Sequence, residues 1–268
     1  DQYQHTLRAS YLGYISQAIV NNFIPLLFLT FQNSYHIPLA KITFLVTVNF
    51  SIQLFVDLLS AKFVDRIGYR VSIVSAHIFI AAGLIGMSFL PDLLPDPFIG
   101  LLTSIALYAV GGGLTEVLIS PIVEACPTEK KSAAMSLLHS FYCWGCVLVI
   151  GISTAFFAAA GIANWRILSL LWAILPAANA VYFSQVPIAH LVEDGRGMSI
   201  GELFRSKLFW IFVLLMVCAG ASEQAMSQWA SAFAESGLNI SKSAGDLAGP
   251  CFFAVMMGIA RTLYAKFS

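Results

Sequence analysis

Long apolar runs, separated by short clusters of charged residues and proline, dominate the chain. Eight of them are about 20 residues or longer, enough for a helix that rises 1.5 Å per residue to cross about 30 Å of hydrocarbon. They cover residues 9–31, 41–63, 71–90, 98–123, 133–160, 167–187, 208–233 and 244–264. The alternating pattern of a membrane β-barrel is absent, and backbone groups in lipid must be satisfied within helices. The pattern therefore predicts an all-α bundle of eight transmembrane helices.

Composition supports this prediction and excludes a soluble domain. Apolar residues make up 59% of the chain, charged residues make up 10%, and the mean hydropathy is +0.82. A soluble domain carries about 25% charged residues. We therefore expect a multi-pass protein of the inner or plasma membrane, surrounded by a lipid bilayer. The formal net charge of zero gives no reason to expect a nucleic-acid partner, and we expect a monomer with no cofactor and no metal.

Lysine and arginine indicate how the bundle sits, because cytoplasmic loops are enriched in both residues. If the eight runs alternate in direction, one side receives all 14 Lys and Arg residues except Lys41, Arg166 and Lys242. This asymmetry predicts that both ends of the chain face the cytoplasm. The polar start from Asp1 to Thr6, and a first run too long for a signal peptide, argue against a cleavable signal. Because the chain does not begin with methionine, we expect a fragment of a longer protein.

A repeat links the two ends of the chain. The letters AKF follow the second run at residues 61–63 and the eighth run at residues 265–267, an offset of 265 − 61 = 204. Between the sixth and seventh runs, Ser199 and Glu202 have the spacing of a capping box, which predicts a short interfacial helix. Six helices, a linker and a second set begun in the same direction are typical of transporters with two parallel halves. We expect a six-helix half at 1–187, a linker at 188–206, and two helices of a second half at 207–268.

The stretch AKFVDRIGYR, residues 61–70, resembles the loop between helices two and three of the major facilitator superfamily, usually written GxxxDRxGRR. The matching residues are Asp65, Arg66, Gly68 and Arg70, whereas Ala61 and Tyr69 depart from the pattern. Glycine permits the tight turn, and the charges can act as a cytoplasmic latch in one of two conformations. A generic basic turn is the alternative interpretation.

Three further stretches resemble the fucose permease branch of that superfamily, which contains sugar and proton symporters. GGGLTEVLISP places Glu116 five residues before a proline, and MSLLHSFYCWG places His139 at the branch's histidine position. GASEQAMSQWASAF supplies Glu223 and Trp229. The resemblance implies the major facilitator fold, with helices one, four and seven around a central cavity. Since that fold has about twelve helices in two halves, it also implies a C-terminally truncated chain.

Glu116 and Glu223 are the candidate sites for proton and substrate. Each lies in an apolar run, where an ionised carboxylate costs about 2.5–3.5 kcal/mol. Hydrocarbon favours the protonated form, which suits a group that gains and loses a proton during transport. The alternative for each is a permanently protonated glutamate that only bonds neighbouring helices.

Polar and aromatic residues complete the candidate substrate site. Asn21, Asn22 and Gln224 can pair with hydroxyl groups, although the fucose permease has an acidic residue in this first helix. Trp229 can stack on the apolar face of a sugar or pack in the bundle, and His139 is either a ligand or a packing residue.

Asp57 and Arg261 correspond under the repeat offset, since 57 + 204 = 261, and both lie near the cytoplasmic helix ends. We interpret them as gating residues at the interface between halves rather than as ligands of the substrate.

Three functions compete. The first is symport of a sugar-like small molecule with a proton or sodium ion. The second is multidrug or metabolite efflux by antiport, but Leu107 stands where such antiporters usually carry arginine, and residues 133–160 contain no proline. The third is an enzyme of disulfide exchange that uses Cys143 and Cys146. That pair lies inside an apolar run, which suppresses the reactive thiolate. We therefore expect a symporter and no enzyme.

Overall fold

The computed structural model describes residues 3–127, 131–189 and 200–267. Within these residues, eight helices are long and apolar enough to cross a membrane, which confirms the prediction of an eight-helix bundle. The spans are Gln4–Tyr35, Leu39–Ser60, Tyr69–Leu93, Pro97–Ala125, Lys131–Ala160, Ile162–Gln185, Lys207–Leu238 and Lys242–Leu263.

Several of these spans consist of more than one helical element. The first part of the chain, called here the six-helix part, contains α1 (Gln4–Asn22), η1 (Ile24–Leu27), α2 (Phe28–Tyr35), α3 (Leu39–Ile67), α4 (Tyr69–Leu93), α5 (Pro97–Ala125), α6 (Lys131–Ala160), η2 (Ile162–Asn164) and α7 (Trp165–Gln185). The remaining elements are α8 (Ile200–Arg205), α9 (Lys207–Leu238), α10 (Lys242–Asp246), the π-helical turn η3 (Leu247–Cys251) and α11 (Phe252–Phe267). The short helix α8 lies where the capping box predicts one, although Ser199 is outside the described residues.

Proline, glycine and a capping aspartate define where helices end. Asp96 caps α5 by accepting a hydrogen bond from the Phe98 amide at 2.9 Å, and Pro97 occupies the first helical position, where no amide hydrogen is needed. Pro25 lies in η1, which interrupts the first span between α1 and α2. Gly68 has a φ of 94°, a left-handed conformation that favours glycine, and it turns the chain from α3 into α4.

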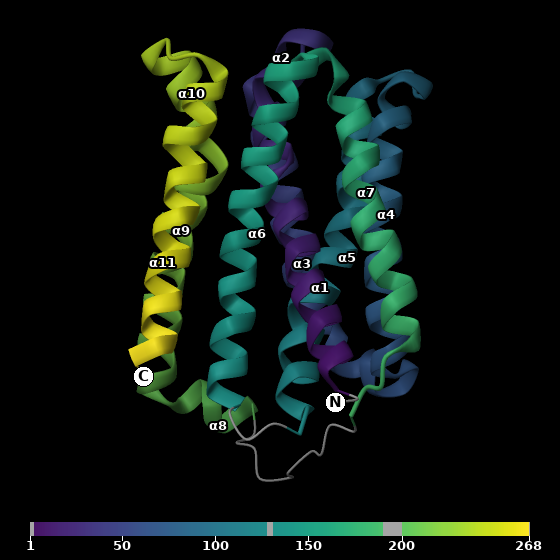
Figure 1. Ribbon diagram of the computed structural model, residues 1–268, viewed down its shortest axis with the longest axis vertical. Coiled ribbons are helices and arrows are strands. Elements are labelled where there is room, and N and C mark those ends of the chain that lie inside the picture. The colour runs from purple at the N-terminus through teal and green to yellow at the C-terminus, as the bar shows by residue number, and fades with distance from the viewer. Residues whose placement is uncertain (1–2, 128–130, 190–199, 268) are drawn as a thin grey trace.

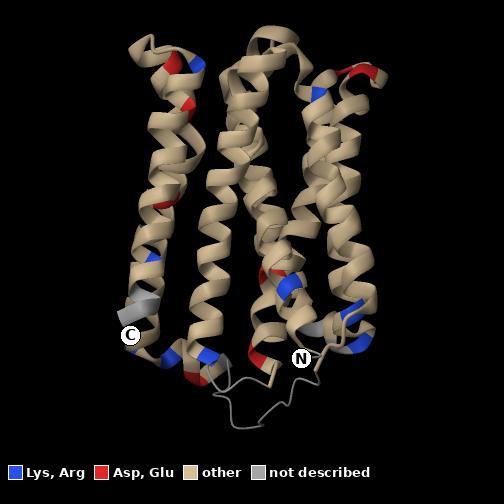
Figure 2. Cartoon of the chain, viewed as in Figure 1, with Lys and Arg blue, Asp and Glu red and all other residues tan. Residues whose placement is uncertain are grey.

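Both described ends of the chain and α8 lie at one end of the bundle (Figure 1). Figure 2 shows that most lysine and arginine residues gather there, so we name it the basic end. Helices α2 and α10 lie at the opposite end, named the α10 end. The positions of the chain ends agree with eight spans of alternating direction.

Burial differs sharply between helices. In the most apolar stretch of the first span, 83% of the residues are buried, whereas in the most apolar stretch of α9 none is buried. Helix α1 therefore lies at the centre of the bundle and α9 at its periphery. Close helix approach depends on glycine: a Cβ on Gly83 of α4 would lie 2.6 Å from the Tyr108 backbone nitrogen of α5. The cluster Gly111–Gly113 has the same role, since a Cβ on Gly113 would lie 2.9 Å from Cβ of Val56 in α3.

Candidate functional site

A polar cavity of about 450 Å³ lies between the six-helix part and the helices α9 and α11. It extends from the middle of α1 toward the basic end. Its lining residues are Tyr14, Asn21, Phe50, Gln53, Leu54, Asp57, Glu116, His139, Tyr142, Met216, Glu223, Gln224 and Arg261. Most of the candidate residues singled out in the sequence therefore meet at one place, although they come from six different helices.

Glu116 reaches the cavity from α5, one turn before Pro121. Its side chain is exposed to the cavity although the helix around it is buried. No described residue forms a hydrogen bond or an ion pair with its carboxylate, but Glu223 and Arg261 are near enough for their charges to act on it. Glu116 thus presents to the cavity a carboxyl group without a partner among the described residues.

Glu223 of α9 and Arg261 of α11 lie next to each other on one wall of the cavity. Their closest side-chain atoms, Glu223 Oε2 and Arg261 Nη2, lie 4.0 Å apart, and both side chains are about one-third exposed. A partly exposed pair at this distance is weak. Asp57 lines the same cavity from α3, and its Oδ1 is buried without a partner among the described residues. The ion pair of Arg261 is therefore with Glu223, while Asp57 lies across the cavity.

An amide cluster, formed by Gln17, Asn21, Asn49 and Gln53, connects α1 to α3 beside the cavity. Gln53 Oε1 accepts a hydrogen bond from Gln17 at 3.1 Å, and its Nε2 donates to Asn21 Oδ1 at 3.2 Å and to Asn49 Oδ1 at 3.0 Å. Asn21 in turn donates to the Tyr142 hydroxyl at 3.2 Å. The cluster holds the amide groups of the cavity wall in fixed orientations.

Gln53, Tyr14 and Tyr142 line the cavity but were not among the site residues selected from sequence. For Gln53, the spacing of polar residues in the sequence could have indicated its place in the site. Asn49, Gln53 and Asp57 recur every four residues in α3, which places polar groups on one face of an otherwise apolar helix.

Two of the residues selected for substrate or proton binding, Asn22 and Trp229, lie outside the cavity lining. Asn22 is buried and donates to the Ala18 carbonyl at 2.9 Å and to Cys146 Sγ at 3.1 Å. Trp229 packs against Phe28, with ring centroids 5.1 Å apart.

Gln224 does line the cavity, and it accepts a hydrogen bond from Ser227 at 3.3 Å. His139 lines it too, with its ring centroid 5.7 Å from that of Tyr14.

The motif loop lies at the basic end, away from the cavity. Arg70 Nη1 donates to the carbonyls of Phe183 at 3.3 Å and Ser184 at 2.7 Å, at the C-terminal end of α7. A guanidinium there satisfies free carbonyls and complements the helix dipole. Arg66 is exposed, and the side chain of Asp65 lies outside those that the structure describes.

The CxxC pair is part of the packing. Cys143 and Cys146 are both buried and reduced, and Cys146 accepts the hydrogen bond from Asn22. A buried thiol behaves as a small apolar group, so this geometry gives no support to disulfide exchange.

Membrane-length helices around a cavity lined by carboxylates and amides are typical of an integral membrane protein with an internal site for a small molecule. The chain belongs to the Major Facilitator Superfamily, whose family model matches residues 10–268. With eight membrane-length helices among the described residues, it is a multi-pass membrane protein, and its fold is the major facilitator fold. No curated protein matches the chain in sequence.

Solved structures with this fold include two xylose transporters and a POT family transporter. A D-xylose-proton symporter has a TM-score of 0.70 and 14% identity, over 97% of this chain and 66% of that one. The xylose transporter XylE from E. coli, in a partially occluded inward-open conformation, has a TM-score of 0.63 and 14% identity, over 100% and 60%. A POT family transporter in complex with a thioalcohol-conjugated peptide has a TM-score of 0.57 and 17% identity, over 81% and 47%. The chain thus spans less than two thirds of each of these structures, and at these identities the likeness shows the fold alone.

Proposed function

We propose that the protein is a proton-coupled symporter that carries a sugar or sugar-like small solute by alternating access. The cavity between the six-helix part and α9 and α11 is the proposed binding site for both solute and proton. In this proposal residues 1–187 form the first half of the transporter, 188–206 the linker, and 207–268 belong to the second half. The protein acts as a monomer in the cell membrane, and the basic end, with the N-terminus, faces the cytoplasm.

The observation that carries the proposal is the excess of acid over base in the cavity. Its lining includes the carboxyl groups of Asp57, Glu116 and Glu223 but a single guanidinium, that of Arg261. Three ionised carboxylates in a low-dielectric site would repel one another at considerable cost, so proton uptake stabilises the site. Glu116 is the proposed coupling group, because Glu223 already has Arg261 as a partner.

The neutral groups of the cavity favour an uncharged, hydroxyl-rich solute. Asn21, Gln53 and Gln224 each present amide donors and acceptors, and Phe50 and Tyr142 offer rings to an apolar face. A cavity of about 450 Å³ falls in the range of about 300–1,000 Å³ typical of small-molecule sites. The similarity to a D-xylose-proton symporter agrees with a solute of this class.

The coupling role of Glu116 is tested by Glu116→Gln in the full-length protein, reconstituted in liposomes with a pH gradient. One proton carried per solute supports about tenfold accumulation per pH unit, since about 1.4 kcal/mol corresponds to a factor of ten. The variant should lose this accumulation yet retain exchange of labelled for unlabelled solute. Glu124→Gln is the matched control, because Glu124 lies in the same helix, is exposed and does not line the cavity. Full accumulation by Glu116→Gln would exclude the coupling role.

The solute and the ion are identified together by a thermal-stability screen of the full-length protein. Hexoses, deoxyhexoses and nucleosides are compared with and without sodium, because a ligand that binds the folded state raises the melting temperature. We expect stabilisation by one sugar class, independent of sodium. Stabilisation that requires sodium would identify sodium, instead of the proton, as the coupling ion. Stabilisation by organic cations alone would favour efflux antiport.

A further inference from the structure

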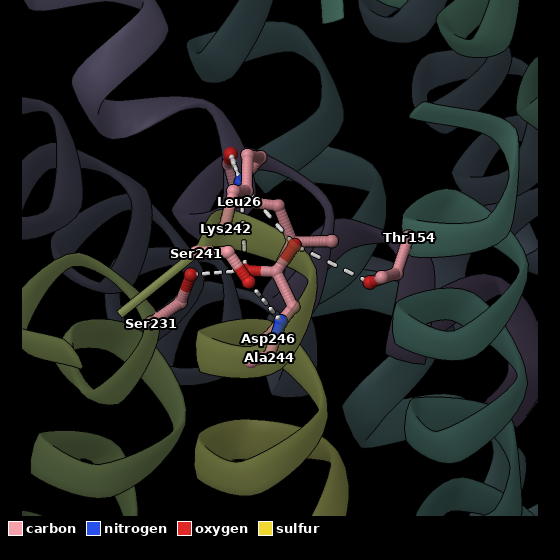
Figure 3. Close-up of polar contacts among 7 residues, drawn as sticks. All are labelled: Leu26, Thr154, Ser231, Ser241, Lys242, Ala244 and Asp246. Carbon is pink, nitrogen blue, oxygen red and sulfur yellow. Dashed lines mark hydrogen bonds and ion pairs between the residues drawn. The ribbon is translucent and has the colours of Figure 1, made fainter. Parts of the chain in front are cut away.

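At the α10 end, an ion pair of the α9–α11 hairpin forms hydrogen bonds with the six-helix part (Figure 3). Lys242 Nζ lies 3.2 Å from Asp246 Oδ2, and the Asp246 side chain is 0% exposed. Both residues belong to α10, in the hairpin formed by α9 and α11. Asp246 also accepts a hydrogen bond from Ser231 of α9, so the pair is already organised within the hairpin.

Two further hydrogen bonds cross from this pair to the six-helix part. Lys242 Nζ donates to the Leu26 carbonyl at 2.7 Å, and Thr154 Oγ1 of α6 donates to Asp246 Oδ2 at 3.3 Å. The Lys242 ammonium also lies 5.7 Å from the ring centroid of Phe157 in α6. Leu26 lies in η1, where the break in the first span makes a backbone carbonyl available to a side chain. Each part thus supplies one donor and one acceptor to the other.

These two hydrogen bonds lie at the end of the bundle where the space between the two parts is closed. The seam is the line along which α9 meets the six-helix part. Between Asn21 and the α10 end it narrows to a space of about 10 Å³, and the lining of this space includes Val46 and Gln228. There Gln228 Nε2 donates to the Asn21 backbone carbonyl at 2.7 Å, and Trp229 packs on Phe28. The cavity lies on the other side of this seam. The two parts therefore close the seam between α1 and α9 at the α10 end, whereas α11 packs on α6 beside the cavity, where a Cβ on Gly258 would lie 3.2 Å from the Trp144 ring.

The chemistry of the pair suits a reversible contact. A buried ion pair contributes little net stability, because desolvation offsets its attraction, but removal of one partner leaves a costly unpaired charge. If the hairpin moves away from the six-helix part, Lys242, Asp246 and Ser231 remain together, and water replaces the two bonds that cross from this pair. The charges are thus never unpaired in either arrangement.

We propose that the Lys242–Asp246 pair is a latch that holds the transporter closed at its α10 end, and that its two bonds to the six-helix part must break before the cavity can open there. The inference extends the proposed function but depends on neither the sugar nor the proton. It requires only the alternating access of a transporter, and its test uses no solute.

The test measures access from the α10 side to a cysteine placed in the closed seam. Val46→Cys is introduced into full-length protein whose native cysteines are replaced, and membrane-impermeant maleimide is added to vesicles of either orientation. Asp246→Asn should speed labelling from the α10 side about tenfold, the effect of about 1.4 kcal/mol on an equilibrium. Thr154→Val, which removes one crossing bond worth about 0.6 kcal/mol in a membrane protein, should speed it about threefold.

The matched control is Asp92→Asn. Asp92 pairs with Arg166 at 2.9 Å at the same end of the bundle, but both residues belong to the six-helix part, so no bond between the parts is lost. Its labelling rate should equal that of the parent. Unchanged rates in both Asp246→Asn and Thr154→Val would overturn the latch. If Asp246→Asn does not fold, Thr154→Val alone decides, because it keeps both charges, and an unchanged rate in that variant overturns the latch. A failure of the sugar or proton assays leaves these rates unaffected.

Discussion

Replacing Gln53 by leucine should destabilise the bundle from its centre, because this side chain holds the amide cluster together. Gln53 is buried and makes hydrogen bonds to Gln17, Asn21 and Asn49. Leucine has a similar volume, so packing around α3 should change little. The variant thus isolates the loss of polar contacts between α1 and α3.

The expected magnitude follows from the number of bonds. A side-chain hydrogen bond in a membrane protein contributes about 0.6 kcal/mol on average. Three such bonds are lost in Gln53→Leu, which gives a decrease of about 2 kcal/mol in the free energy of unfolding. The amide of Asn21 also loses its fixed orientation, so solute affinity should fall as well.

The assay is reversible unfolding in mixed micelles of lipid and detergent, followed by tryptophan fluorescence. Thr103→Val is the control, because Thr103 is exposed and bonds only the Ile99 carbonyl of its own helix at 2.8 Å. Its stability should stay within about 0.5 kcal/mol of the parent, as for most surface substitutions. If Gln53→Leu were as stable as Thr103→Val, the amide cluster would have no structural importance, and its assigned role between α1 and α3 would be wrong.

Two other changes test the packing of the six-helix part. Gly83→Val should prevent the close approach of α4 and α5 and lower the free energy of unfolding by roughly 1–3 kcal/mol or more through overpacking. Gly151→Ala should be neutral, because no atom lies within 4 Å of the added Cβ. The melting temperatures of the two variants in detergent test this difference. Arg70→Ala should lower stability by about 1–2 kcal/mol, because it removes the charged donor at the end of α7. Arg70→Lys, measured in the same way, should recover only part of that loss, since the lysine ammonium is more strongly hydrated than a guanidinium and loses more water when it bonds the carbonyls.

Hydropathy was sufficient to predict the number of helices but not where they break. The first run was placed at residues 9–31, whereas the span covers Gln4–Tyr35 and is interrupted at η1. Likewise, the run at 244–264 contains the π-helical turn around Pro250. A hydropathy average cannot detect such breaks, because the residues on both sides are apolar and their helices continue beyond the hydrocarbon.

Charge in an apolar run was a good guide to the site. Asp57, Glu116, Glu223 and Arg261 come from four helices, and all line the cavity. A charged residue within a bundle is stable only beside water or a partner, so its position alone indicates an interior polar space.

Neutral polar residues were harder to assign from sequence. Asn21 and Asn22 are adjacent, but neighbouring residues on a helix point about 100° apart, and only Asn21 lines the cavity. The choice between them requires knowledge of which face of α1 is directed inward. For the same reason Gln53 stayed unrecognised until the packing of α1 against α3 was known.

The proposal that solute and proton share one cavity can be tested by proton movement driven by solute alone. Full-length protein is reconstituted in liposomes that contain a pH-sensitive dye, with no initial pH gradient, and the sugar identified by thermal stability is added outside. We expect acidification of the interior with the parent protein, and none with Glu116→Gln although solute exchange persists. Alkalinisation of the interior, or solute uptake by the parent protein without any change of internal pH, would contradict the proposal that the cavity couples solute uptake to proton uptake.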